Sequence, residues 1–179
     1  MRDRYDVIVV GARVAGSTLA ALLGDAGASV LLVDRARFPS TTPSTHFFRG
    51  AGLVAVLERL GVLEQALALG SPPLTRQFDY EDGGPDAADG PPQGPGEAGF
   101  CLSVRREPLD ALLLARAAAS AEIVEGAAVG ALMRDGERVA GVTLRDGRGA
   151  RAALVVGADG RHSLVAKEVG AADLRLLDG

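Results

Sequence analysis

The 179-residue sequence has no tryptophan, one cysteine and two histidines, and only 4% of its residues are aromatic. A single cysteine, Cys101, excludes a disulfide framework within the chain and is typical of a reducing compartment. Because Cys101 stands in an apolar run, we interpret it as a buried small hydrophobe rather than a nucleophile. His46 and His162 are too few and too far apart in sequence to indicate a metal site, so no metal is expected.

Long apolar runs are also missing. No stretch approaches the roughly 18 apolar residues of a membrane-spanning helix, and the first apolar run is too short for a signal peptide. A net charge of −4 gives no support for nucleic-acid binding. The sequence therefore predicts a cytoplasmic protein with no transmembrane segment and no nucleic-acid partner, and its length predicts one domain.

A strand–helix–strand pattern occupies the N-terminal part of the chain. The apolar residues 5–10 and 29–34 predict two buried strands, the second ending in Asp34. Residues 14–26, rich in alanine and leucine, predict a helix that ends at Gly27. The unit spans about 30 residues, which is the size of a crossover between parallel strands.

The middle of the chain is less regular. Residues 35–49 contain two prolines and many Ser and Thr residues, and they predict a loop. Two helices are expected at 51–60 and 63–69, and a strand is expected at 74–80. Residues 81–99 are dominated by glycine and proline without an apolar period, so we expect a loop or an insertion there.

The C-terminal half predicts a small antiparallel meander. Asp-Gly pairs at 135–136 and 146–147 supply turns between apolar segments. Regular structure is expected to resume at 100–104. The predicted helices are 107–119 and 162–169, and the predicted strands are 123–124, 127–134, 138–144 and 150–156.

The first glycine-containing turn opens the predicted N-terminal helix. Gly11 fits a tight turn, and Gly16 fits close packing of the helix on the strand. Arg13 replaces the middle glycine of G-x-G-x-x-G, which weakens the match, although a guanidinium group is a phosphate partner. Asp34 lies near the spacing at which an acid accepts hydrogen bonds from ribose hydroxyls. The turn therefore indicates a nucleotide cofactor, and the alternative is a tight turn without a ligand.

A second turn, Gly157-Ala158-Asp159-Gly160, also lies between an apolar strand and a predicted helix. Alone it has two interpretations, because Asp159 could serve a nucleotide site or simply cap the helix that follows. Pairing with the first turn favours the nucleotide site.

Together these motifs resemble the FAD-dependent monooxygenases and oxidoreductases of the aromatic-hydroxylase type, including the geranylgeranyl-reductase-like branch. Residues 155–163 (VVGADGRHS) are similar to the family's second motif, whose Asp-Gly pair lies near the cofactor pyrophosphate. Residues 106–110 (REPLD) resemble its R-x-x-L-D segment, whose arginine lies close to the flavin. Residues 44–48 (STHFF) resemble a loop near the flavin in one branch.

The resemblance implies FAD as cofactor and NAD(P)H as electron donor. It also implies an α/β fold of the Rossmann-like FAD/NAD(P)-binding type, with a parallel sheet and a small antiparallel β-meander. No catalytic residue is assigned. The residues expected to bind the cofactor are Gly11, Ala12, Arg13, Val14, Ala15, Gly16, Asp34, Arg35, Arg106, Val129, Asp159 and Gly160.

The expected function is the FAD-binding part, as a single domain over 1–179, of a flavin-dependent oxidoreductase. The favoured activity is NAD(P)H-dependent hydroxylation of a small organic substrate. The alternatives are a double-bond reductase of the geranylgeranyl-reductase type and a non-catalytic nucleotide-binding fragment. Nothing after Asp159 resembles the family's third motif or its substrate-domain sheet. We therefore expect a truncated portion without turnover of its own, which self-associates or pairs with a complementing C-terminal fragment.

Overall fold

The computed structural model describes residues 1–42, 52–70, 72–75, 79–81, 84–86 and 100–171. The chain divides into two compact units. The first combines Met1–Arg37 with Ala117–Gly179, and the second comprises Phe38–Arg116. The expected loop at 44–48 lies outside the described residues.

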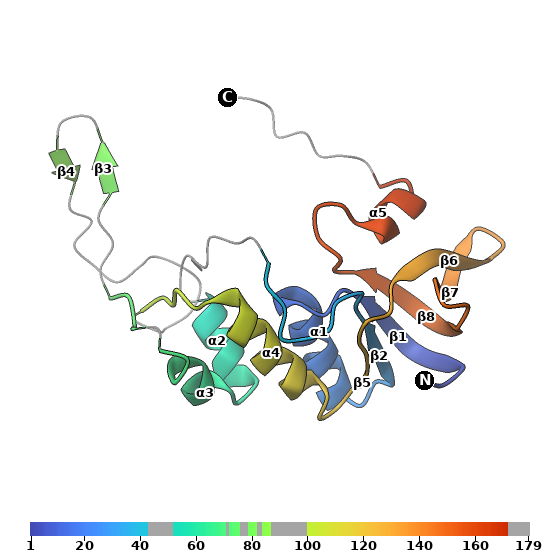
Figure 1. The fold of residues 1–179 in the computed structure, drawn as a ribbon, viewed down its shortest axis with the longest axis horizontal. Helices are drawn as coiled ribbons and strands as arrows, with labels where there is room; N and C mark the ends of the chain where they lie inside the picture. Colours follow the sequence, from blue (N-terminus) through green and yellow to red (C-terminus); the bar gives the residue numbers. More distant parts are fainter. Residues whose placement is uncertain (43–51, 71, 76–78, 82–83, 87–99, 172–179) are drawn as a thin grey trace. The chain divides into compact units, whose positions relative to one another are not determined.

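The first unit is built on one mixed sheet. Within the described residues, six strands form this sheet in the order β5-β2-β1-β8-β7-β6 (Figure 1). The strands are β1 (Arg4–Val10), β2 (Val30–Val33), β5 (Glu122–Val124), β6 (Val129–Asp135), β7 (Arg138–Leu144) and β8 (Gly149–Gly157). The helix α1 (Val14–Asp25) connects β1 to β2, which lie parallel. This arrangement confirms the predicted α/β fold.

The meander is continuous with the parallel part of the sheet. β6 and β7 are antiparallel, as are β7 and β8, while β8 lies parallel to β1. The predicted strand at 123–124 is present as β5, which pairs in parallel with β2 at the edge of the sheet opposite β6. A segment of three residues carries too little pattern to specify its partner, which the crossover connection decides instead.

The core of this unit consists of aliphatic side chains on the strands. Ile8, Leu31 and Val142 are fully buried, and Val165 from the last helix packs with them. This helix, α5, spans Leu164–Glu168, so it begins two residues later than expected and His162 lies in the turn before it. Ser163 acts as N-cap there, which explains the later start.

The second unit contains three helices in its described residues: α2 (Gly52–Arg59), α3 (Leu63–Leu67) and most of α4 (Arg106–Ala117). Of the strand expected at 74–80, the described residues show a bridge between Leu74 and Cys101 and the start of β3 (Asp79–Glu81), while residues 76–78 lie outside the described part. β3 pairs with β4 (Gly84–Asp86), so part of the expected loop at 81–99 forms a short hairpin. Cys101 is buried, as its apolar neighbours indicated.

In the part of the chain that the structure describes, no helix combines the length and the hydrophobicity needed to cross a membrane. The same residues bring no three His, Cys, Asp or Glu side chains together as a group that could hold a metal ion.

A buried tyrosine ties the beginning of β1 to β5. Tyr5 is 3% exposed, and its hydroxyl donates a hydrogen bond to Glu122 Oε2 at 2.7 Å. Burial, reinforced by the bond to this carboxylate, raises the pKa of Tyr5 to about 12. The N-terminal amine of Met1 lowers the pKa of Glu122 most, and the hydrogen bond from Tyr5 lowers it further.

Raising the pH should therefore destabilise the fold through Tyr5. An unfolded tyrosine loses its proton near pH ~10, whereas Tyr5 keeps it to about 12 in the folded chain. The folded state thus binds more protons between these values, and the free energy of unfolding falls as the pH rises through them. Urea unfolding at about pH 9 and about pH 11 measures the fall, which should be smaller in Tyr5→Phe. An equal fall in both proteins would contradict the assignment.

Candidate cofactor-binding site

The two glycine-containing turns, far apart in sequence, meet at one edge of the sheet. β1 and β8 are parallel neighbours with Val10 opposite Gly157, so the turns that follow them leave the sheet side by side. The amide of Ala158 donates a hydrogen bond to the Val10 carbonyl oxygen at 2.7 Å. A Cβ atom added at Gly11, whose φ is +101°, would lie 2.4 Å from the Ala158 carbonyl oxygen. The two turns are therefore in direct backbone contact.

Gly16 brings the first turn of α1 against the preceding loop. A Cβ atom at this position would lie 1.7 Å from the Gly11 carbonyl oxygen and 3.3 Å from Ala158 Cβ. Side chains cannot occupy such positions, so the close approach requires glycine at 16. Gly11, Gly16 and Ala158 form one contact between strand, helix and second turn.

Among the residues that the structure describes, the first backbone amides of α1 have no hydrogen-bond acceptor. Arg13 is the N-cap residue, and its side chain makes no capping hydrogen bond. The first turn contains no acidic residue, and the amide of Ser17 is the first to bond back, to the Arg13 carbonyl at 2.9 Å. Helix geometry leaves the amides of residues 14–16 without an intrahelical acceptor. Their N–H groups and the helix dipole fit the negative charge of a diphosphate.

Asp34 ties the end of β2 to the first turn. Its Oδ2 accepts a hydrogen bond from the Ala12 amide at 2.7 Å, and its Oδ1 accepts one from the Ala36 amide at 2.7 Å. The Ala12 carbonyl in turn accepts a hydrogen bond from the buried Ser17 hydroxyl at 2.7 Å. A carboxylate has about four lone-pair sites, so Asp34 keeps capacity to accept ribose hydroxyls.

Asp159 caps the helix α5, which is the structural alternative that the sequence left open. Its carboxylate accepts hydrogen bonds from the Ser163 hydroxyl and, at 2.7 Å, from the Leu164 amide. Gly160 has φ +83°, and a Cβ atom there would meet no atom of the described residues within 4 Å. The backbone at Gly160 is therefore accessible to a ligand, whereas the Asp159 side chain is engaged in capping α5. Contact between this turn and a pyrophosphate stays a prediction.

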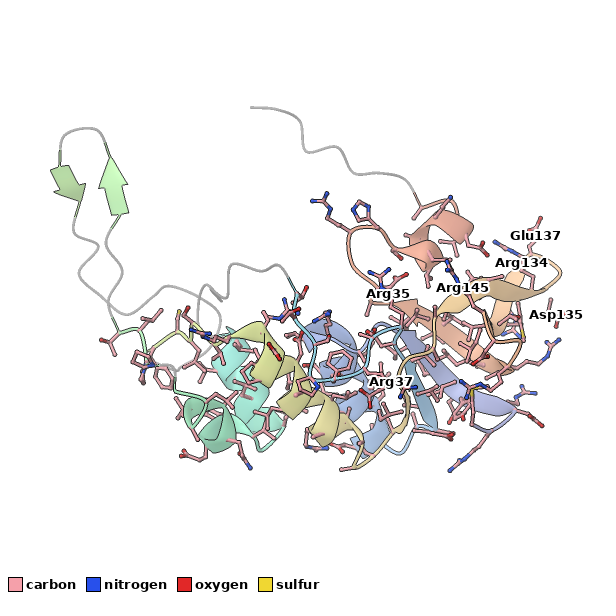
Figure 2. The ribbon with its side chains drawn as sticks, in the orientation of Figure 1. Arg35, Arg37, Arg134, Asp135, Glu137 and Arg145 are labelled. Atoms are coloured by element: carbon pink, nitrogen blue, oxygen red, sulfur yellow. The ribbon has the colours of Figure 1, made fainter. Side chains whose placement is uncertain are left out.

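The remaining predicted residues lie in different surroundings. Arg35, labelled in Figure 2, follows Asp34 directly and is exposed. Val129 is buried at the first position of β6, with its backbone paired to β7. Arg106 belongs to the second unit, where its Nε and Nη2 donate to the two carboxylate oxygens of Asp110 at 3.0 and 3.2 Å. Asp110 is completely buried, so this pair is a fixed feature of α4.

Sequence reasoning did not identify Ser17 or the partner of Arg106. Ser17 is fully buried in the first turn of α1, and a polar residue within a run of small apolar residues was its only signal. Asp110 stands four residues after Arg106, which is a spacing that favours ion pairs on one helix face. That spacing was visible in the sequence, but the burial of the carboxylate was not.

Comparison with known proteins agrees with this geometry. The family model described as FAD binding domain matches residues 4–175. The 6-methylpretetramide 4-monooxygenase of Streptomyces rimosus is 37% identical over 171 residues, covering 92% of this chain and 40% of that protein. A probable electron transfer flavoprotein-quinone oxidoreductase of Escherichia coli, YdiS, is 32% identical over 179 residues, covering 94% of this chain and 39% of that protein.

A solved structure shows the same fold. PqsL of Pseudomonas aeruginosa, described as a probable FAD-dependent monooxygenase, superposes with a TM-score of 0.76 at 28% identity, covering 96% of this chain and 47% of that one. The chain thus spans about 40% of the length of the curated relatives named above. The family model matches residues 4–175, and the fold and the two adjacent glycine turns agree with that family. The chain therefore belongs to the FAD-binding-domain family.

Proposed function

We propose that this chain supplies the FAD site of an NAD(P)H-dependent monooxygenase that hydroxylates a small organic substrate. The observation that carries the proposal is the contact between the two glycine turns, which places free helix amides beside Asp34 at one sheet edge. The relative at 37% identity is a monooxygenase by name, and it supports this activity over the alternatives.

Different residues of the first unit would bind different parts of FAD. Backbone amides of residues 14–16 would hold the diphosphate, with Gly11 and Gly16 keeping side chains out of the way. Asp34 would accept hydrogen bonds from the adenosine ribose, and the neighbouring Arg35 would add positive charge. Ala12, Arg13, Val129, Asp159 and Gly160 would line the same site. Bound FAD supplies the electron transfer between NAD(P)H, oxygen and substrate.

The partners of this chain are part of the proposal. Leu154, on the central strand β8, is 54% exposed, and Val169, just after α5, is 49% exposed. We propose that the chain associates with the rest of a longer enzyme or with a second copy, since it spans about 40% of the length of its curated relatives. The single cysteine supports a cytoplasmic location.

Kinetic assays of the full-length protein that contains this chain test the activity. We expect NADH or NADPH oxidation that consumes oxygen and is coupled to hydroxylated product. Oxygen-independent electron transfer to a quinone would favour a second candidate, because the relative YdiS at 32% identity is named as a quinone oxidoreductase. Tight FAD binding without any NAD(P)H oxidation would contradict the proposed donor.

A further inference from the structure

The helix α5 is too short to be stable by itself and is held at both ends. It has five residues, fewer than an isolated helix needs in water. At its start, Asp159 accepts hydrogen bonds from Ser163 and Leu164, and the Ser163 hydroxyl accepts one from the Ala166 amide at 2.9 Å. These bonds join the helix directly to the second glycine turn.

At its other end, α5 is fixed to the edge strand β6, beside which it lies in Figure 1. The Glu168 Oε2 accepts a hydrogen bond from the Leu132 amide at 3.1 Å. The Glu168 carbonyl oxygen accepts a second bond, from Arg134 Nη2 at 2.7 Å. An outward-facing amide of an edge strand has no neighbouring strand to bond, so the carboxylate of Glu168 takes that place.

The position of α5 matters because of what precedes it. Ala158 and Asp159 lie against Gly11, with a Cβ atom at Gly11 reaching 2.9 Å from Asp159 Cα. A Cβ atom at Gly157 would likewise reach 2.8 Å from Val165 Cβ, so the second turn is packed tightly between α5 and the first turn. Any shift of α5 therefore displaces the second turn relative to the amides of the first.

We propose that Glu168 is a positioning residue for the cofactor site, which it serves by fastening α5 to β6. The inference rests on the proposed function, in that FAD is bound where the two turns meet. Glu168 does not touch the cofactor in this account. It acts through Asp159 and the backbone of the second turn, whose place beside Gly11 it maintains.

Substitution at Glu168 separates this role from a general loss of stability. Glu168→Ala removes the bond to Leu132 and should weaken FAD binding about five-fold, a change typical of one hydrogen bond. Glu168→Gln keeps an oxygen acceptor and should restore the parent affinity. Glu137→Ala is the matched control, because it removes an exposed acid from the neighbouring β6–β7 connection, labelled in Figure 2. FAD titration of the full chain, well below its melting temperature, gives the affinities.

The parent protein is titrated first, so that a parent without FAD binding contradicts the proposed function rather than the role of Glu168. Parent affinity in Glu168→Ala overturns the positioning role, as does equal weakening in the Ala and Gln variants, which would indicate charge rather than the hydrogen bond. If Glu168→Ala does not fold, Arg134→Ala decides instead, because it removes the second bond to α5. Weakened FAD binding in that variant supports the proposal, and unchanged binding overturns it.

Discussion

Gly16→Ala should abolish FAD binding. The added Cβ atom would lie 1.7 Å from the Gly11 carbonyl oxygen and 2.9 Å from its carbon, and neither backbone atom can move without opening the turn. Overpacking of this kind costs about 1–3 kcal/mol or more, because the surrounding backbone must shift. The shift would separate α1 from Ala158 and thereby break the contact between the two turns. Thermal unfolding and FAD titration measure the two consequences.

Gly52→Ala is the matched control for this substitution. Gly52 begins α2, and a Cβ atom there would meet no atom of the described residues within 4 Å. Alanine also favours a helix by up to about 1 kcal/mol relative to glycine, so this variant should keep or gain stability and bind FAD as the parent does. Parent-like FAD binding in Gly16→Ala would show that the close approach is not needed.

Asp34→Ala should weaken FAD binding at least about ten-fold and should also lower stability. The substitution removes two bonds that hold the turn, from the amides of Ala12 and Ala36, as well as the expected bonds to ribose. The sequence alone suggests a change in binding with little effect on folding. The structure adds the second effect, since a buried amide left without an acceptor costs about 1–3 kcal/mol.

Asp6→Ala is a suitable comparison for Asp34→Ala. Asp6 lies on an exposed position of β1, where its Oδ2 accepts one backbone bond, from the Ser29 amide at 2.8 Å. This bond is exposed and lies near the start of β1, away from the turns that follow the strand's end. The Asp6 variant should therefore lose some stability and keep its FAD affinity. Equal FAD affinities in the Asp34 and Asp6 variants would show that Asp34 does not bind the cofactor.

The sequence predicted the fold where local signals agree. β7 has the predicted bounds, Arg138–Leu144, because an Asp-Gly turn stands at each end of an apolar segment. Local signals failed where pairing is decided at a distance. The three residues of β5 gave no sign of their parallel partner. Partner choice for such short segments depends on contacts that no local pattern encodes.

For the candidate site, glycine spacing was the informative signal. It placed two turns after two apolar strands, and the structure shows these strands side by side with Val10 opposite Gly157. The hydrogen bonds that fix the turns were not predictable from the residue types. Ser17 holds the Ala12 carbonyl, and Glu168 holds the Leu132 amide, each through a polar atom whose direction only the folded chain determines.

The central claim is that the paired turns bind the diphosphate and adenosine of FAD. The most direct measurement is a titration of the full chain with FAD and with FMN, which shares the flavin but lacks the adenosine and the second phosphate. The account predicts that FAD binds at least about ten-fold more tightly than FMN, because the free amides of α1 and the Asp34 carboxylate contact only the larger cofactor fully. Equal or tighter binding of FMN would contradict it.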